Sequence, residues 1–182
     1  MGSAGLLLGL LALMPRSAPA QVVDNWTGAS SSLWGTGGNW SGGVPTNLSI
    51  ATFNTSSGLP SSLQLLAAST AYSLNFSNAG GANAYSLDTA GNVNVDTLTL
   101  TAGITNSDAG ALTFYNQTTL GANQTWANNG GTMNFYGNVN LGSGANGRVL
   151  TINGSGPVNI NGVIADGGSA AGIAEVKDIA RR

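Results

Sequence analysis

The side chains able to do acid–base chemistry in this chain are few, because it contains no His and no Cys. Paired carboxylates hydrolyse glycosidic bonds, and acid clusters serve β-helix lyases. Asp88 and Asp96 are the closest candidate pair in sequence, but no Lys or Arg accompanies them to hold an acidic polysaccharide. Asp is also a common turn residue. We therefore interpret the aspartates between Gln21 and Ile173 as solvated turn residues. They are Asp24, Asp88, Asp96, Asp108 and Asp166.

No metal or cofactor site is predicted. Without Cys and His the chain lacks the usual zinc ligands. The calcium-binding repeat G-G-x-G-x-D is not matched, since Ala79-Gly80-Gly81-Ala82 lacks the acid and Asp166 precedes its glycines. The glycine-rich loops follow neither a P-loop nor a dinucleotide-binding pattern. A net charge of −2 gives no electrostatic reason to expect nucleic acid or an anionic membrane as a partner.

Tryptophans offer the clearest candidate for a binding surface. Trp26, Trp34 and Trp40 lie among Gly, Ser and Asn near the N-terminus. Flat indole faces beside such residues suit stacking on sugars, which would make this region a carbohydrate-binding platform. Alternatively, the indoles cover the open end of the first coil of a repeat array, because such ends must be capped for solubility and Trp buries a large apolar area. We favour the cap and keep the sugar platform as the alternative.

The elements that position these residues are predicted to be short β-strands. Only 7% of the residues are charged, whereas Gly alone contributes 28 residues and Asn, Ser and Thr are abundant. Gly and Asn tolerate positive φ, and Asn, Ser and Thr bond their own backbone in turns. A hydrophobic content of 42% argues against simple disorder. A chain that turns often and has few good helix formers indicates an all-β fold.

One two-strand unit recurs in the second half of the chain. It spans Leu112–Leu120, Met133–Leu141 and Leu150–Ile160, and a related piece spans Val93–Leu100. Each unit is a short alternating strand, a polar or glycine turn and a second strand. The alternation predicts an apolar face made of Leu112, Phe114, Met133, Phe135, Val139, Leu141, Leu150, Ile152, Val158 and Ile160. It predicts an opposite, polar face made of Thr113, Asn134, Asn138, Asn140, Thr151 and Asn159.

The spacing of these strands favours a β-solenoid. The first strands begin at residues 98, 112, 133 and 150, at intervals of 14, 21 and 17. Such spacing fits coils that each bury their apolar residues against a neighbouring coil. A sandwich of antiparallel hairpins is the alternative, but the units resemble one another in sequence, which hairpins in a sandwich need not do. Weaker strands are predicted at Ile50–Phe53, Ser62–Leu66 and Tyr72–Phe76.

Outward asparagine pairs are the main polar feature of the predicted coils. If neighbouring coils stack in register, their side-chain amides can bond one another and form ladders. The functional alternative is a polar groove for sugar hydroxyls, and we favour the ladders. The pairs are Asn92/Asn94, Asn138/Asn140 and Asn159/Asn161.

The N-terminal segment has the features of a cleavable signal. Gly5–Met14 is an apolar run of ten residues, too short to span a bilayer. Ala18-Pro19-Ala20 supplies a small-x-small pattern for cleavage before Gln21. We expect residues 1–20 to be a signal peptide, 21–60 a Trp- and Gly-rich cap region, 61–168 the solenoid coils and 169–182 a charged tail.

The order of these motifs resembles that of bacterial proteins with autotransporter-associated β-strand repeats. NWTGASSSLWGTGGNWSGGVPTN at residues 25–47 resembles the Trp-rich head that follows their signal peptide. TLTLTAGITNSDAGALTFYNQTTLGANQTW at 97–126 and GSGPVNINGVIADGG at 154–168 resemble their following coils. The resemblance covers most of residues 24–168. It implies a right-handed parallel β-helix, exported and displayed at the cell surface, with no catalytic activity.

The chain departs from this family after residue 168. The family's Lys-Thr-Gly-x-Gly-Thr-Leu-like repeat should follow a phrase such as GVIADGG, but the chain continues as SAAGIAEVKDIARR. No C-terminal barrel or sorting anchor is recognisable. We expect a truncated or frame-shifted reading frame, so that this chain is the front of a longer protein.

The sequence thus predicts an exported structural segment with a stalk or adhesion role, not an enzyme. The alternative is a carbohydrate-binding module that uses Trp26, Trp34 and Trp40, and a polysaccharide-degrading enzyme ranks third. The partners expected are surface glycans or further copies that associate through solenoid ends. Contact with a membrane is expected only through export or through an anchor beyond this segment.

Overall fold

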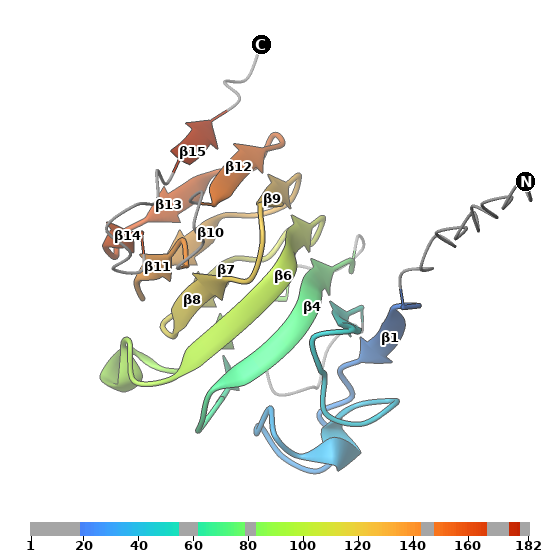
Figure 1. The fold of residues 1–182 in the computed structure, drawn as a ribbon. Coiled ribbons are helices and arrows are strands. Elements are labelled where there is room, and N and C mark those ends of the chain that lie inside the picture. The colour runs from blue at the N-terminus through green and yellow to red at the C-terminus, as the bar shows by residue number, and fades with distance from the viewer. Residues whose placement is uncertain (1–18, 55–61, 79–82, 143–147, 167–174, 179–182) are drawn as a thin grey trace, which may run out of the picture.

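The computed structural model describes residues 19–54, 62–78, 83–142, 148–166 and 175–178, so the predicted signal segment lies almost entirely outside the described residues. The described chain is all-β and winds as a β-solenoid of about 5 turns (Figure 1). All pairings between its named strands are parallel. The predicted solenoid is therefore confirmed, and the antiparallel sandwich is not the fold.

Short strands alternate with turns along the described parts of the chain. The only helical pieces among the described residues are 3₁₀ turns at Gly37–Asn39 and Ala90–Asn92. The strands are β1 Val22–Asn25, β2 Ser49–Phe53, β3 Ser62–Leu63, β4 Ser69–Phe76, β5 Tyr85–Leu87, β6 Thr97–Asn106, β7 Leu112–Phe114, β8 Gln117–Leu120, β9 Gln124–Asn128, β10 Met133–Phe135, β11 Val139–Asn140, β12 Val149–Asn153, β13 Val158–Ile160, β14 Ile164–Ala165 and β15 Glu175–Asp178.

The strands stack into three ladders. The first ladder contains the first halves of β4 and β6, then β8, β11 and β14. The second contains β1, β2, the second halves of β4 and β6, then β9, β12 and β15. The third runs β3, β5, β7, β10 and β13. Because β4 and β6 each cross from the first ladder to the second, these two ladders form one sheet.

A bulge makes the corner between the first and second ladders. The register of β4 against β6 shifts between Ala71 and Ser73, which lets the strand bend. Gly103 follows the bend with φ +116°, and a Cβ there would lie 2.1 Å from the carbonyl oxygen of Thr125. Only glycine combines this backbone conformation with so close an approach.

The register corrects the predicted repeat. Two of the predicted units, Leu112–Leu120 and Met133–Leu141, do run from the third ladder to the first. Leu150–Ile160 instead runs from the second ladder to the third, because β12 pairs with β9 and β13 pairs with β10. The true repeat follows single ladders, as in Phe114, Phe135 and Ile160, which lie 21 and 25 residues apart. Every corner looks alike in sequence, since all three ladders share the same alternation.

The piece Val93–Leu100 is also corrected. Its strand begins at Thr97, and the preceding residues form a turn. Asn94 has φ 61°, and the Val95 side chain is 68% exposed. Alternating Val and Asn therefore mark a turn here, because no neighbouring coil covers the valines.

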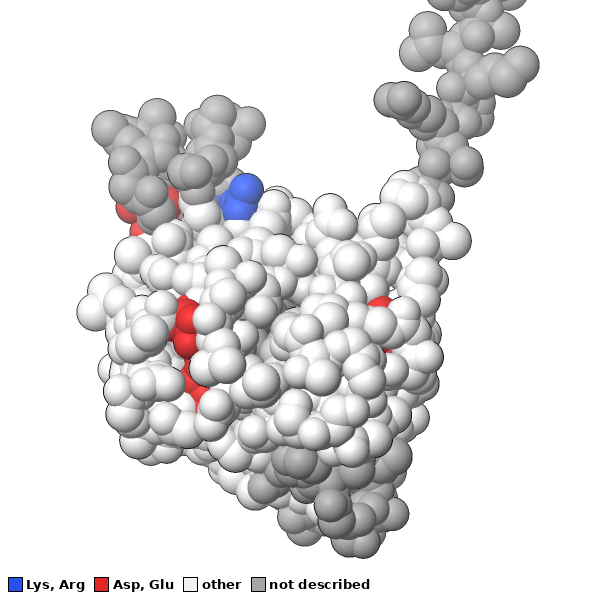
Figure 2. All heavy atoms as spheres, turned by 90° about the horizontal axis from the view of Figure 1, so that it is seen from below, with Lys and Arg blue, Asp and Glu red and all other residues white. Residues whose placement is uncertain are grey.

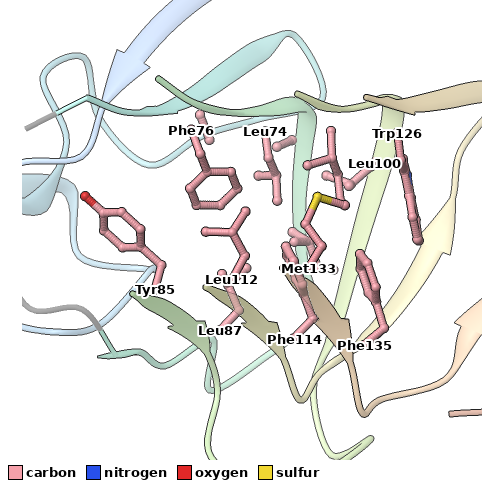
Figure 3. Close-up of a cluster of buried hydrophobic side chains, with 14 of the residues drawn as sticks. Leu74, Phe76, Tyr85, Leu87, Leu100, Leu112, Phe114, Trp126, Met133 and Phe135 are labelled. Atoms are coloured by element: carbon pink, nitrogen blue, oxygen red, sulfur yellow. The ribbon is translucent and has the colours of Figure 1, made fainter. Parts of the chain in front are cut away.

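The core is a column of apolar side chains inside the coils, shown in Figure 3. The predicted inward residues are buried, and only Ile152, Val158 and Ile160, near the C-terminal end, are partly buried. Aromatic rings stack from coil to coil. Phe53 stacks on Phe76 at 4.6 Å between ring centroids, and Phe135 lies 4.4 Å from both Phe114 and Trp126. Replacing such a buried ring by alanine costs ~3–5 kcal/mol, so coil-to-coil stacking carries much of the stability.

Candidate functional site

The three N-terminal tryptophans come together at the N-terminal end of the core. Trp26 directly follows β1, and its backbone N–H donates to the carbonyl oxygen of Thr52 at 2.8 Å. Trp34 is held over the third ladder, where its backbone N–H donates to the carbonyl of Gln64 at 2.9 Å. Trp40 pairs with Trp26 through an isolated antiparallel bridge. The loop from 27 to 39 thus folds back across the end of the first coil.

The indoles pack against one another and then onto the core. Trp40 lies 5.0 Å from Trp26 and 4.8 Å from Trp34 in edge-to-face contacts, and 5.8 Å from Phe53. Trp26, Trp34 and Trp40 are only 0%, 1% and 4% exposed. No indole face is open to a sugar in this arrangement, so stacking on carbohydrate would require the plug to open. The geometry is that of a cap on the apolar column.

Asn39 organises the capping loop. Its Oδ1 accepts hydrogen bonds from the backbone N–H groups of Ser30 and Ser31, both at 2.8 Å. Its Nδ2 donates to the carbonyl oxygen of Leu33 at 2.8 Å, and the residue is fully buried. Sequence reasoning missed Asn39, because an Asn among Gly and Ser reads as an ordinary exposed turn residue.

The interpretation of the aspartates as solvated turn residues is wrong for Asp24, Asp88 and Asp108, which are 3%, 0% and 0% exposed. Asp96 is half-buried and Asp166 is exposed. Asp88 and Asp108 are buried because turns within a solenoid pack on the turns of neighbouring coils, so a turn residue need not face solvent, whereas Asp24 lies within strand β1 and not in a turn. On the face of the molecule shown in Figure 2, charged side chains form only small, scattered patches.

Asp88 and Asp96 are close enough to interact electrostatically. Burial raises the pKa of the Asp88 carboxyl, the N–H of Leu65 lowers it, and the charge of Asp96 raises it further. Asp88 Oδ1 accepts the Leu65 N–H at 2.8 Å, and Asp88 takes the left-handed φ of 61°. The structure thus brings the sequence's candidate acid pair together, but the Asp88 carboxyl has no surface on which a substrate could be contacted. Its geometry is that of a turn support.

Inward-facing asparagines form an amide ladder that the sequence did not predict. Asn106 Nδ2 donates to Asn128 Oδ1 at 2.8 Å, and Asn128 Nδ2 donates to the carbonyl of Pro157 at 2.7 Å. The Oδ1 atoms also accept the backbone N–H groups of Asp108 and Gly130. These amides lie at the corner between the second and third strand ladders. They provide hydrogen-bond partners for buried backbone groups of the turns in successive coils.

The predicted outward asparagine pairs behave differently from expectation. Asn94 and Asn138 link coils by accepting the backbone N–H groups of Asn138 and Val163. Asn140 accepts the N–H of Gly142 within its own turn. Direct amide-to-amide contact on the outside occurs between Asn159 and Asn134, at 3.0 Å. Side chain to backbone bonds therefore replace most of the predicted amide ladder.

Two tyrosines form the one exposed aromatic stack among the described residues. The rings of Tyr115 and Tyr136 are 5.3 Å apart and nearly parallel, at 14°. They follow β7 and β10 at the corner between the third and first ladders, and Tyr136 is 46% exposed. Sequence reasoning did not single out these tyrosines, although the Phe-Tyr pairs that contain them recur in two of the predicted units. A flat ring pair at the surface, beside asparagines, is a chemical feature suited to binding.

Comparison with known proteins adds no further assignment. Within the described residues, no helix has the length and apolar character needed to cross a membrane, and no group of three or more acidic, His or Cys side chains could hold a metal ion. No family model, no curated protein and no solved structure matches the chain.

Proposed function

We propose that this chain is a structural β-solenoid segment of an exported surface protein, where it acts as a stalk or an adhesion scaffold and not as an enzyme. The observation that carries the proposal is the uninterrupted parallel stacking of coils on a core closed at its N-terminal end by Trp26, Trp34 and Trp40. Each coil adds ~4.8 Å along the axis. Length in such a fold grows one coil at a time, which suits a spacer.

The placement of the acids supports a non-catalytic role. Asp24, Asp88 and Asp108 are buried, so their carboxyls cannot meet a polymer at the surface. Asp88 and Asp108 instead accept the backbone N–H groups of Leu65 and Gly110. Arg148 is the one basic residue between Gln21 and Ile173. A polysaccharide lyase needs a cation to hold the carboxylate of its substrate, and no ion pair joins Asp24, Asp88 or Asp108 to a described Lys or Arg.

Export is supported by the join between the signal segment and the fold. Ala20 and Gln21 are exposed, and β1 begins at Val22. Cleavage before Gln21 would therefore release the complete first strand without removing any strand of the solenoid. The absence of Cys also suits passage across membranes in an unfolded state, and the resemblance to autotransporter-associated repeats favours display at the cell surface.

Solenoid ends are the surfaces proposed for self-association. At the C-terminal side the described strands β13 and β14 have no further partner in their ladders, and Val163 and Ile164 are 64% and 41% exposed. Strand edges of this kind pair readily with other chains. The N-terminal end is instead filled by the tryptophan cap, so association is expected at the opposite end.

Expression of the full chain in a Gram-negative host tests the export proposal. We expect a mature product outside the cytoplasm whose N-terminal residue is Gln21. An Ala20→Arg variant, which removes the small residue at the cleavage point, should accumulate unprocessed. A full-length wild-type product retained in the cytoplasm would contradict export, whatever the fold of the purified protein.

A further inference from the structure

The tyrosine pair belongs to a fixed column of turn positions. The backbone N–H groups of Tyr115, Tyr136 and Asn161 donate to the carbonyl oxygens of Leu87, Phe114 and Phe135, at 2.9, 2.8 and 2.8 Å. The three residues therefore occupy the same place in successive coils. Two members of the column carry rings, and the third carries a short amide.

Tight turns hold this column rigid. A Cβ at Gly137 would lie 1.9 Å from the carbonyl oxygen of Asn116, and a Cβ at Gly162 would lie 2.2 Å from that of Gly137. Successive turns are thus in direct backbone contact. The two rings are held at the coil spacing before any ligand arrives, which reduces the ordering that binding requires.

The column leaves aromatic surface open to solvent. Tyr136 is 46% exposed, and Tyr115 is its one ring partner among the described residues. Beyond Tyr136, towards the C-terminal coils, the next position in the column is the exposed Asn161. Because the Asn161 side chain is shorter than that of a tyrosine, the aromatic stack of the described residues ends at Tyr136, and no described ring covers its C-terminal side.

Three asparagines lie in the same stack of turns as the two tyrosines: Asn94, whose backbone N–H donates to the carbonyl of Tyr115, Asn138, two residues after Tyr136, and Asn161 in the column itself. The side-chain oxygen of Asn94 accepts the backbone N–H of Asn138, two coils on, and that of Asn138 accepts the N–H of Val163 in the next coil. These bonds fix the orientation of both amides. Their NH₂ groups have no partner among the described residues, and neither has the side chain of Asn161. An aromatic ring can pack against the apolar face of a sugar, and amide NH₂ groups beside that ring can donate hydrogen bonds to the sugar hydroxyls.

The charge around the stack is low and negative. The described acids near it are Asp88, which precedes Tyr115 in the column and is buried, and the half-buried Asp96, whose backbone carbonyl accepts the N–H of Gln117. No described Lys or Arg side chain lies on these turns; Arg148 is on the approach to β12. Such a surface disfavours an acidic polymer and accepts an uncharged one.

We infer that Tyr115 and Tyr136, together with Asn94, Asn138 and Asn161, form a binding site for neutral carbohydrate. A pyranose ring lies against the exposed part of the Tyr136 ring. Its hydroxyls accept hydrogen bonds from the side-chain NH₂ groups of the three asparagines. This site is separate from the buried tryptophans. It goes beyond the structural role proposed above and does not depend on export, since it belongs to the folded chain.

Affinity electrophoresis of the purified full chain tests this site directly. Native gels would contain hydroxyethyl cellulose, glucomannan, xylan or α-mannan, with polygalacturonate as the acidic counterpart. We expect retardation in at least one neutral gel and none in polygalacturonate. Tyr136→Ala and Tyr136→Leu should weaken binding at least tenfold, whereas Tyr136→Phe should retain it. Tyr72→Ala, which alters a partly buried tyrosine outside any ring stack, is the matched control and should bind like the wild type.

Thermal melts separate loss of the ring from loss of the fold. Tyr136→Leu keeps apolar volume at the position, so binding lost in a variant that melts like the wild type identifies the ring itself. Wild-type protein that runs unretarded in all four neutral gels overturns the inference. Equal retardation of the wild type and Tyr136→Leu, or stronger binding to polygalacturonate than to the neutral polymers, overturns it as well.

Discussion

Trp40 donates its indole N–H to the backbone carbonyl oxygen of Trp34 at 2.8 Å, inside a cluster from which water is excluded. This bond closes the loop that contains the 3₁₀ turn at Gly37–Asn39 and holds the Trp34 ring against that of Trp40, which packs in turn on Phe53. The cap is therefore a single packed unit, and the stability of the N-terminal end depends on it.

Removal of one indole should open this end. Trp40→Ala deletes ring contacts with Trp26, Trp34 and Phe53, and we expect it to lower the free energy of unfolding by ~3–5 kcal/mol. Chemical denaturation measures the loss, and light scattering should show new oligomers, because the apolar column is uncovered. Val22→Ala, at a side chain 54% exposed, is the matched control. A Trp40→Ala protein as stable and monodisperse as that control would contradict the role of the cap.

The inner amide ladder should matter more than the outer one. Asn128→Ala leaves the N–H of Gly130 and the carbonyl of Pro157 without their buried partner, which costs about 1–3 kcal/mol per orphaned group. Asn159→Ala removes a comparable amide bond to Asn134 at the surface, where water replaces it, and should change stability by less than about 0.5 kcal/mol. Equal losses in urea unfolding of the two variants would argue against a structural role for the inner ladder.

Asp88 should make stability depend on pH. Its pKa in the folded state is raised above the ordinary value of 3.8, first by burial. The folded state therefore holds the proton more tightly than the unfolded state, so this contribution to stability is complete below the unfolded pKa and is lost as pH rises through the folded pKa. Melting temperatures measured from pH 3 upwards should show this fall superimposed on other titrations.

Asp88→Asn isolates that contribution. Asn also tolerates the left-handed φ of 61°, and its Oδ1 can still accept the Leu65 N–H. The variant should lack the Asp88 component of the pH dependence and should melt at or above the wild-type temperature at neutral pH. Asp166→Asn, at an exposed acid, serves as the comparison. A wild-type stability that rises through the same window more steeply than that of Asp88→Asn would reverse the predicted sign.

Close turn stacking gives a prediction at glycine. Gly137→Ala places a methyl group 1.9 Å from the carbonyl oxygen of Asn116, so the turns must separate, at a cost of about 1–3 kcal/mol. Gly35→Ala meets nothing within 4 Å and should be neutral. Urea denaturation of both variants compares them. A neutral Gly137→Ala would mean that the turns are not in backbone contact.

Alternation along each strand was predictable because a pleated strand always turns successive side chains to opposite faces. Leu112, Phe114, Met133 and Phe135 accordingly lie inside the coils. The phase of the repeat was not predictable from the same pattern. Leu150–Ile160 resembles the other units, yet it turns a different corner, because strand–turn–strand segments look alike at each corner of a coil.

Burial of polar residues was the hardest feature to predict. Asn39 lies in a 3₁₀ turn, Asn106 ends β6 and Asp108 lies in the turn that follows, and next to turns these residue types normally indicate exposure. They are buried because loops and turns from neighbouring coils cover them, and that contact joins residues far apart in the sequence. The tyrosine stack has the same origin: Tyr115 and Tyr136 become neighbours only when β7 and β10 pair in register.

Disulfide trapping in this cysteine-free chain tests the stacked solenoid most directly. Thr113 and Asn134 are parallel partners on adjacent coils, whereas Thr113 and Asn159 are two coils apart, roughly 10 Å, beyond the reach of a disulfide. We predict that Thr113→Cys/Asn134→Cys oxidises to an intramolecular disulfide under mild conditions and that Thr113→Cys/Asn159→Cys stays reduced. Failure of the first pair to close, or equal closure of both pairs, would contradict the parallel coils on which the proposed function rests.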